Sequence, residues 1–160
     1  MKNNLSKSKR ILSTFLPMII FIMGLMVLLG VLIGVPYIFQ NINDINKIMP
    51  GILTFIIGLS YLITFIFLWN IVDSSKASIF ILDNVKRFKL IGVLQFINLV
   101  IEYVSFIGSG HRGMRFFDLA PGIFITPGMA VYFITSLICF VIAESFDEAI
   151  KIKEENEFTV

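Results

Sequence analysis

The residues best suited to chemistry are three polar side chains in the apolar segment "LQFINLVIEYVSF", residues 94 to 106. Gln95, Asn98 and Glu102 are spaced by three and four residues, so they share one face of a helix. Such a face can bind a proton or a polar ligand, and ionisable residues inside a membrane segment are candidates for function. It can equally join helices through interhelical hydrogen bonds. Both alternatives stay open, and in both the stripe faces protein or water rather than lipid.

Partners for this stripe are expected on neighbouring apolar segments. Tyr61 and Tyr132 lie at similar depths in two of these segments. Their hydroxyls can donate hydrogen bonds to the Glu102 carboxylate. We therefore predict an intramembrane polar site composed of Gln95, Asn98, Glu102, Tyr61 and Tyr132.

The composition is typical of an integral membrane protein. Of the 160 residues, 57% are hydrophobic and only 15% are charged, and the mean hydropathy is +0.90. A chain of this length holds a handful of spans of about 20 residues each. We predict one all-α domain over residues 1–160, a bundle of four transmembrane helices. The expected spans are about 12–38, 52–72, 90–108 and 127–146, the last starting where Thr126 and Pro127 form a typical helix N-terminus.

Several classes of function are disfavoured. One cysteine and one histidine leave no basis for a disulfide or a Cys/His metal cage. No phosphate-binding loop or nucleophile motif is present. The net charge of +2 is too small for a nucleic-acid-binding protein. We therefore predict no catalytic residues, no cofactor, no metal site and no direct binding of nucleic acid.

The placement of the basic residues predicts the orientation in the bilayer. Four spans put both termini on one side, and ten of the 13 Lys and Arg residues then share that side. By the positive-inside tendency, both termini are expected in the cytoplasm.

The segment "DSSKASIFILDNVKRFK", residues 73 to 89, differs from a simple connection. Ile81, Val85 and Phe88 share one helical face, and Lys76, Lys86, Arg87 and Lys89 occupy the others. This pattern predicts a short basic amphipathic helix on the cytoplasmic leaflet. Alternatively, the charges only fix the topology.

The C-terminal segment 147–160 is expected to be a cytoplasmic tail that continues the last helix and then frays. Its apolar end is also a candidate peptide ligand for a cytoplasmic groove. The candidate partner-binding residues are Lys86, Arg87, Lys89, Glu154, Glu155, Asn156, Glu157, Phe158, Thr159 and Val160.

Gly30 and Gly34 form a small-xxx-small pair in the first span. Such a pair lets another helix approach closely. The approaching helix belongs either to the same bundle or to a second copy, so a homodimer is the alternative.

Two stretches resemble a known family. "NVKRFKLIG", residues 84 to 92, and "AIKIKEENEFTV", residues 149 to 160, resemble the YoaS-like family of small, uncharacterised bacterial membrane proteins. Glu157 and Phe158 stand where that family usually has Asp and Leu. The resemblance implies four spans in a bacterial cytoplasmic membrane and no established activity. It also implies a small helix-turn-helix regulator as a candidate partner at the cytoplasmic face.

The function expected from these observations is that of a multi-pass cell-membrane protein without enzymatic activity. It would act as a regulatory or interaction protein through its cytoplasmic face, with the helix-turn-helix regulator as candidate partner. The alternative is a small transporter or immunity-type membrane protein that uses Glu102 as an intramembrane proton or ligand site.

Overall fold

Four long helices make up most of the molecule. The computed structural model describes residues 7–75, 78–108, 117–120 and 123–157. The helices are α1 (Lys7–Gln40), α2 (Ile45–Ser74), α3 (Leu82–Gly108) and α4 (Pro127–Glu157). Each is long and apolar enough to cross a membrane. The shortest has 27 residues, or about 40 Å, against about 30 Å of hydrocarbon in a bilayer. The predicted all-helical architecture with four apolar helices is confirmed.

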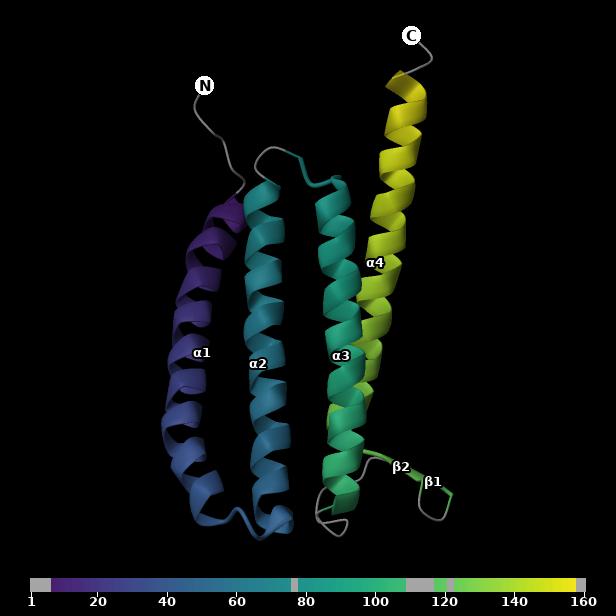
Figure 1. Ribbon diagram of the computed structural model, residues 1–160. Coiled ribbons are helices and arrows are strands. Elements are labelled where there is room, and N and C mark those ends of the chain that lie inside the picture. The colour runs from purple at the N-terminus through teal and green to yellow at the C-terminus, as the bar shows by residue number, and fades with distance from the viewer. Residues whose placement is uncertain (1–6, 76–77, 109–116, 121–122, 158–160) are drawn as a thin grey trace.

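The helices pack in the order in which they occur in the sequence. Extensive contacts join α1 to α2, α2 to α3 and, most extensively, α3 to α4. In Figure 1, α1, α2 and α3 stand side by side and α4 crosses α3, with the start of α1 and the end of α4 at the top. We call this the termini-bearing end. The upper part of α4 extends beyond the ends of the other three helices (Figure 1).

The buried side chains gather between α2, α3 and α4. In α1, Leu16 is the one buried side chain among the residues whose burial is described. The apolar clusters are Ile71, Ile91 and Cys139; Val85, Ala143 and Ile150; and Phe106, Phe124 and Met129. Helix α1 is thus attached to one side of a core that the other helices build.

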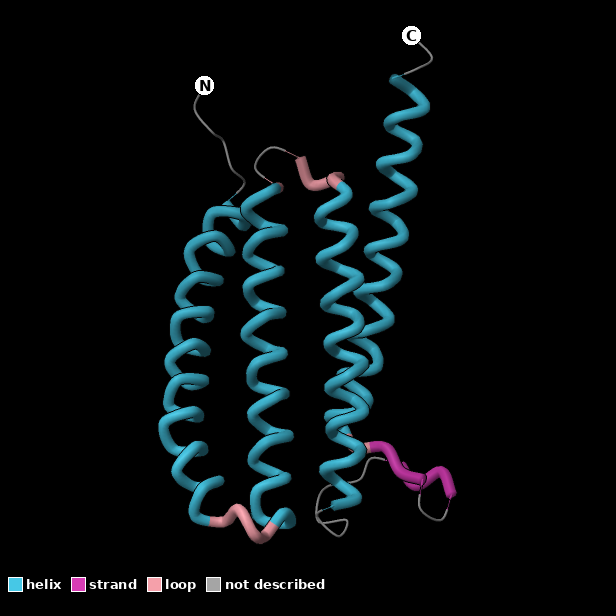
Figure 2. Tube along the Cα trace, in the orientation of Figure 1, coloured by secondary structure: helices cyan, strands magenta, loops and turns pink. Residues whose placement is uncertain are grey.

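A two-stranded hairpin precedes α4, an element that the predicted all-helical architecture did not include. Strands β1 (Phe117–Ala120) and β2 (Ile123–Ile125) are antiparallel, with Phe117 opposite Ile125. Figure 2 shows it in magenta, at the end opposite the termini. Phe124 is buried there, and its ring centroid lies 4.2 Å from that of Phe106 on α3.

The connection between α2 and α3 differs from the predicted amphipathic helix over residues 73–89. Helix α2 includes Asp73 and Ser74, and residues 82–89 are the first turns of α3. No separate helix lies in the described part of this segment. The physical reason is that Val85 and Phe88 pack against α4, where Phe88 makes an edge-on contact with Phe146. The apolar face expected on lipid is therefore covered by protein.

Candidate functional site

Polar side chains from three helices meet inside the apolar core. We call them the polar layer: Ser60, Tyr61 and Thr64 of α2, Gln95 and Asn98 of α3, and Tyr132 and Ser136 of α4. All are buried except Tyr61, which is partly exposed. Burying a polar group costs free energy unless the group is hydrogen-bonded, so the hydrogen-bond partners of these side chains decide whether the layer is stable.

Most of the polar layer is satisfied by direct hydrogen bonds. Gln95 Nε2 donates to Thr64 Oγ1 at 3.3 Å, and Thr64 Oγ1 donates to the Ser60 carbonyl at 2.9 Å. Ser136 Oγ donates to the Gly92 carbonyl at 2.8 Å. These bonds join α3 to both of its neighbours. They match the interhelical role that the sequence left open for the stripe.

The two tyrosines of the predicted site meet each other. The Tyr61 hydroxyl donates to the Tyr132 hydroxyl at 3.1 Å, and the ring centroids are 6.2 Å apart. This bond connects α2 directly to α4 across the core.

Asn98 is the unusual member of the layer. It is fully buried, and neither its Oδ1 nor its Nδ2 has a hydrogen-bond partner, which is also true of Ser60 Oγ. Counting along the antiparallel helices from the Gln95–Thr64 contact places Asn98 level with Tyr61, and counting from the Ser136–Gly92 contact places it about half a turn from the level of Tyr132. A buried amide without partners costs about 1–3 kcal/mol. Stability therefore does not account for an asparagine at this position.

Glu102 lies one helical turn from Asn98, at the start of α4. Thr126 Oγ1 donates to its Oε1 at 3.4 Å. A Cβ atom on Gly128 would lie 3.1 Å from the same oxygen, so the glycine permits this approach. The N-terminus of a helix carries partial positive charge, which stabilises a nearby carboxylate. This position explains how an apolar helix accommodates the acid.

Thr126 also caps α4. Its Oγ1 accepts the backbone N–H of Met129 at 3.1 Å, and Pro127 is the first helical residue. This is the helix start that the Thr-Pro pair predicted.

Gln95 thus contacts Thr64, and Tyr61 contacts Tyr132. Glu102 contacts Thr126 at the start of α4 and is near enough to Tyr132 for an electrostatic interaction. The sequence reasoning missed the parts played by Thr64 and Ser136, and the hydrogen bond from Thr126 to Glu102. Thr64 and Ser136 each follow another layer residue by four positions, which was the available signal. In the described part of the chain, no group of His, Cys, Asp and Glu is placed to hold a metal ion.

A second polar cluster lies at the termini-bearing end. Asn84 is fully buried, and its Nδ2 donates to the Ile79 carbonyl at 2.9 Å. Its Oδ1 accepts from Arg87 Nη1 at 2.8 Å and from Ser74 Oγ at 3.0 Å. Arg87 also donates to the Asn70 carbonyl at 3.4 Å. This candidate partner-binding arginine is therefore held against α2.

Other candidate partner-binding residues are more accessible. Lys86 and Lys89 are exposed on α3, and Glu154, Glu155 and Asn156 are exposed on α4. Glu157 is the last residue of α4. Phe158, Thr159 and Val160 lie outside the described residues.

A cleft of about 380 Å³ lies beside these residues at the termini-bearing end. One wall is formed by residues 80–83 of the α2–α3 connection and the start of α3, and the other by Ile150, Lys153 and Glu154 of α4. Phe80 and Leu82 remain 45% and 55% exposed there, so the cleft has accessible apolar side chains next to charged ones. We call this the terminal cleft.

One known family matches most of the chain. Residues 39–160 match the family described as "Protein of unknown function (DUF2975)". The chain belongs to this family. The matched range contains α2, α3 and α4, and therefore both the polar layer and the terminal cleft. No curated protein and no solved structure matches the chain. Membership of DUF2975 carries no activity, so a function has to be argued from the geometry.

Proposed function

We propose that the protein is a non-enzymatic regulatory membrane protein, and that its termini-bearing end faces the cytoplasm and binds a partner. The orientation is supported by the basic residues, because ten of 13 belong to the segments at that end. The start of α1 and the end of α4 lie there as well (Figure 1).

The observation that carries this proposal is the terminal cleft. Exposed Phe80 and Leu82 provide apolar anchors, and Asp83, Lys153 and Glu154 provide a charged rim. Grooves with this composition take up amphipathic helices or peptides. Helix α4 forms one wall and then projects further (Figure 1), which extends the surface available to a partner.

The charge of α4 favours a basic partner. Between Glu144 and Glu157 the sequence has six carboxylates and two lysines. Opposite charges on two surfaces speed their encounter and exclude like-charged partners. A small helix-turn-helix regulator has the required basic surface, because it must bind DNA phosphates. The resemblance to YoaS-like proteins suggests the same partner. Binding at the cleft would prevent the basic surface of the regulator from contacting DNA.

The test is a matched pair of variants. Leu82→Ser removes an anchor inside the cleft, and Ile152→Ser removes an equally exposed apolar side chain that does not line it. We measure co-purification of the helix-turn-helix regulator and transcription from the promoter that it controls. Leu82→Ser should reduce co-purification at least tenfold and change transcription, while Ile152→Ser should behave like the wild type. Equal behaviour of the two variants would remove the basis of the proposal.

A second candidate function is favoured by Asn98. Its unpartnered amide lies level with Tyr61 and one turn from Glu102, which suits a transporter or immunity-type protein with an intramembrane proton or ligand site. In that case Glu102→Gln should abolish transport or resistance while the protein still accumulates in membranes. Reduced accumulation with retained function would favour a purely structural role for the carboxylate.

A further inference from the structure

An apolar groove lies between α1 and α2, at the end opposite the termini. Its volume is about 610 Å³, within the range of about 300–1,000 Å³ that is usual for ligand sites. The groove is lined almost entirely by apolar residues, among them Gly30, Gly34, Val35, Ile48, Gly51 and Phe55.

Missing side chains keep this groove open. A Cβ atom on Gly34 or Gly51 would meet no atom within 4 Å, so neither glycine is required for helix packing at that point. Gly30 differs, because its Cβ would already touch the Phe55 ring at 3.4 Å. All the lining residues belong to α1 and α2, so we expect the groove to be open to lipid in a bilayer.

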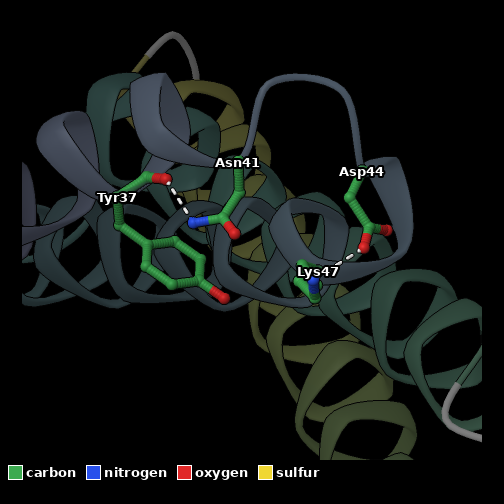
Figure 3. Close-up of polar contacts among 4 residues, drawn as sticks. All are labelled: Tyr37, Asn41, Asp44 and Lys47. Atoms are coloured by element: carbon green, nitrogen blue, oxygen red, sulfur yellow. Dashed lines mark hydrogen bonds and ion pairs between the residues drawn. The ribbon is translucent and has the colours of Figure 1, made fainter.

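An ion pair and a hydrogen-bonded asparagine lie in the α1–α2 connection and the first turn of α2, next to one end of the groove. Lys47 Nζ lies 3.0 Å from Asp44 Oδ2, and Asn41 Nδ2 donates to the Tyr37 carbonyl at 3.0 Å (Figure 3). Tyr37 and Ile48 line the groove, whereas the pair does not. Lys47 precedes Ile48 in α2 and interacts electrostatically with Tyr37, so the pair lies beside the groove. The hydrogen bond from Lys47 lowers the pKa of Asp44, which favours the ionised carboxylate. Both side chains of the pair are well exposed.

We propose that the groove binds a phospholipid with a zwitterionic headgroup that carries a primary ammonium. One acyl chain occupies the apolar groove, the phosphate lies at Lys47, and the ammonium donates hydrogen bonds to Asp44. An anionic headgroup would place its phosphate beside Asp44 without an ammonium to offset the repulsion. A headgroup with a quaternary ammonium has no N–H to donate. This site is independent of the proposed partner binding at the opposite end.

The acyl-chain part of the proposal is tested by filling the groove. The full-length protein is purified in detergent with equal amounts of phosphatidylethanolamine and phosphatidylglycerol, and the retained lipids are counted by native mass spectrometry. Gly34→Phe should reduce retained phosphatidylethanolamine at least tenfold. Gly24→Phe is the matched control, because a Cβ at Gly24 also meets no atom within 4 Å and Gly24 does not line the groove. Equal retention, or equal loss, in the two variants would overturn the proposal.

The headgroup part is tested by removing one charge. Asp44→Asn leaves Lys47 without its carboxylate, so the preference for phosphatidylethanolamine over phosphatidylglycerol should fall at least fivefold. Phosphatidylcholine should compete poorly with phosphatidylethanolamine for the wild-type protein. An unchanged preference in Asp44→Asn, or no preference in the wild type, would overturn the proposal even if Gly34→Phe did not fold.

Discussion

Replacing Asn84 with alanine should loosen the termini-bearing end of the bundle. The side chain is fully buried, and its amide joins the α2–α3 connection, through Ile79, to Arg87 of α3. It also accepts a hydrogen bond from Ser74 at the end of α2. Asn84→Ala removes all three bonds at once.

The expected loss of stability follows from the partners. The bond to the Ile79 carbonyl is neutral and contributes about 1 kcal/mol, and the charge-assisted bond from Arg87 contributes about 2 kcal/mol. The Ser74 bond adds little, because Ser74 Oγ also lies 2.9 Å from the Ile71 carbonyl and can donate there instead. We expect Asn84→Ala to lower the free energy of unfolding by about 3 kcal/mol.

The assay is reversible unfolding in mixed micelles, followed by far-UV circular dichroism. Asn41→Ala is the control, because it removes a single side-chain hydrogen bond at an exposed position. This variant should lower the free energy of unfolding by no more than about 1 kcal/mol. If Asn84→Ala were no less stable than Asn41→Ala, Asn84 would not be the hub that its hydrogen bonds indicate.

Two further predictions concern the polar layer. Asn98→Leu should leave the free energy of unfolding unchanged or raise it by about 1 kcal/mol, since it removes two unsatisfied atoms. Gln95→Leu should lower it by about 1 kcal/mol through the lost bond to Thr64. The reverse order in the same unfolding assay would contradict the assigned partners. Tyr61→Phe and Tyr132→Phe should be coupled by about 0.5–1 kcal/mol in a double-mutant cycle, and strictly additive losses would show that their hydrogen bond adds no stability.

The number and type of helices could be predicted because hydrophobicity over 20 residues is a strong signal. The start of α4 could be predicted equally well, since Thr126 and Pro127 combine a side-chain cap with a residue that suits the first turn. The expected start of the second span at residue 52 was less accurate, because α2 begins at Ile45 and contains Pro50 in its second turn. Near a helix N-terminus, proline disturbs few hydrogen bonds.

The pairing of polar side chains could not be predicted from one helix at a time. Spacing shows which residues share a face of α3, but the rotation and register of α2 and α4 decide which side chains meet. Those quantities place Tyr61 against Tyr132 and bring Glu102 to Thr126. The role of Asn84 was missed for the same reason, since its partners lie on three different segments.

The most direct test of the account is the sidedness of the two ends of the bundle. Single cysteines are introduced as Ile152→Cys on α4 and Asn43→Cys in the α1–α2 connection, both exposed, after the buried Cys139 is replaced by serine. A membrane-impermeant maleimide should label the Asn43→Cys protein in intact cells and the Ile152→Cys protein only after permeabilisation. Labelling of Ile152→Cys in intact cells would place the terminal cleft outside the cytoplasm and contradict the proposed function.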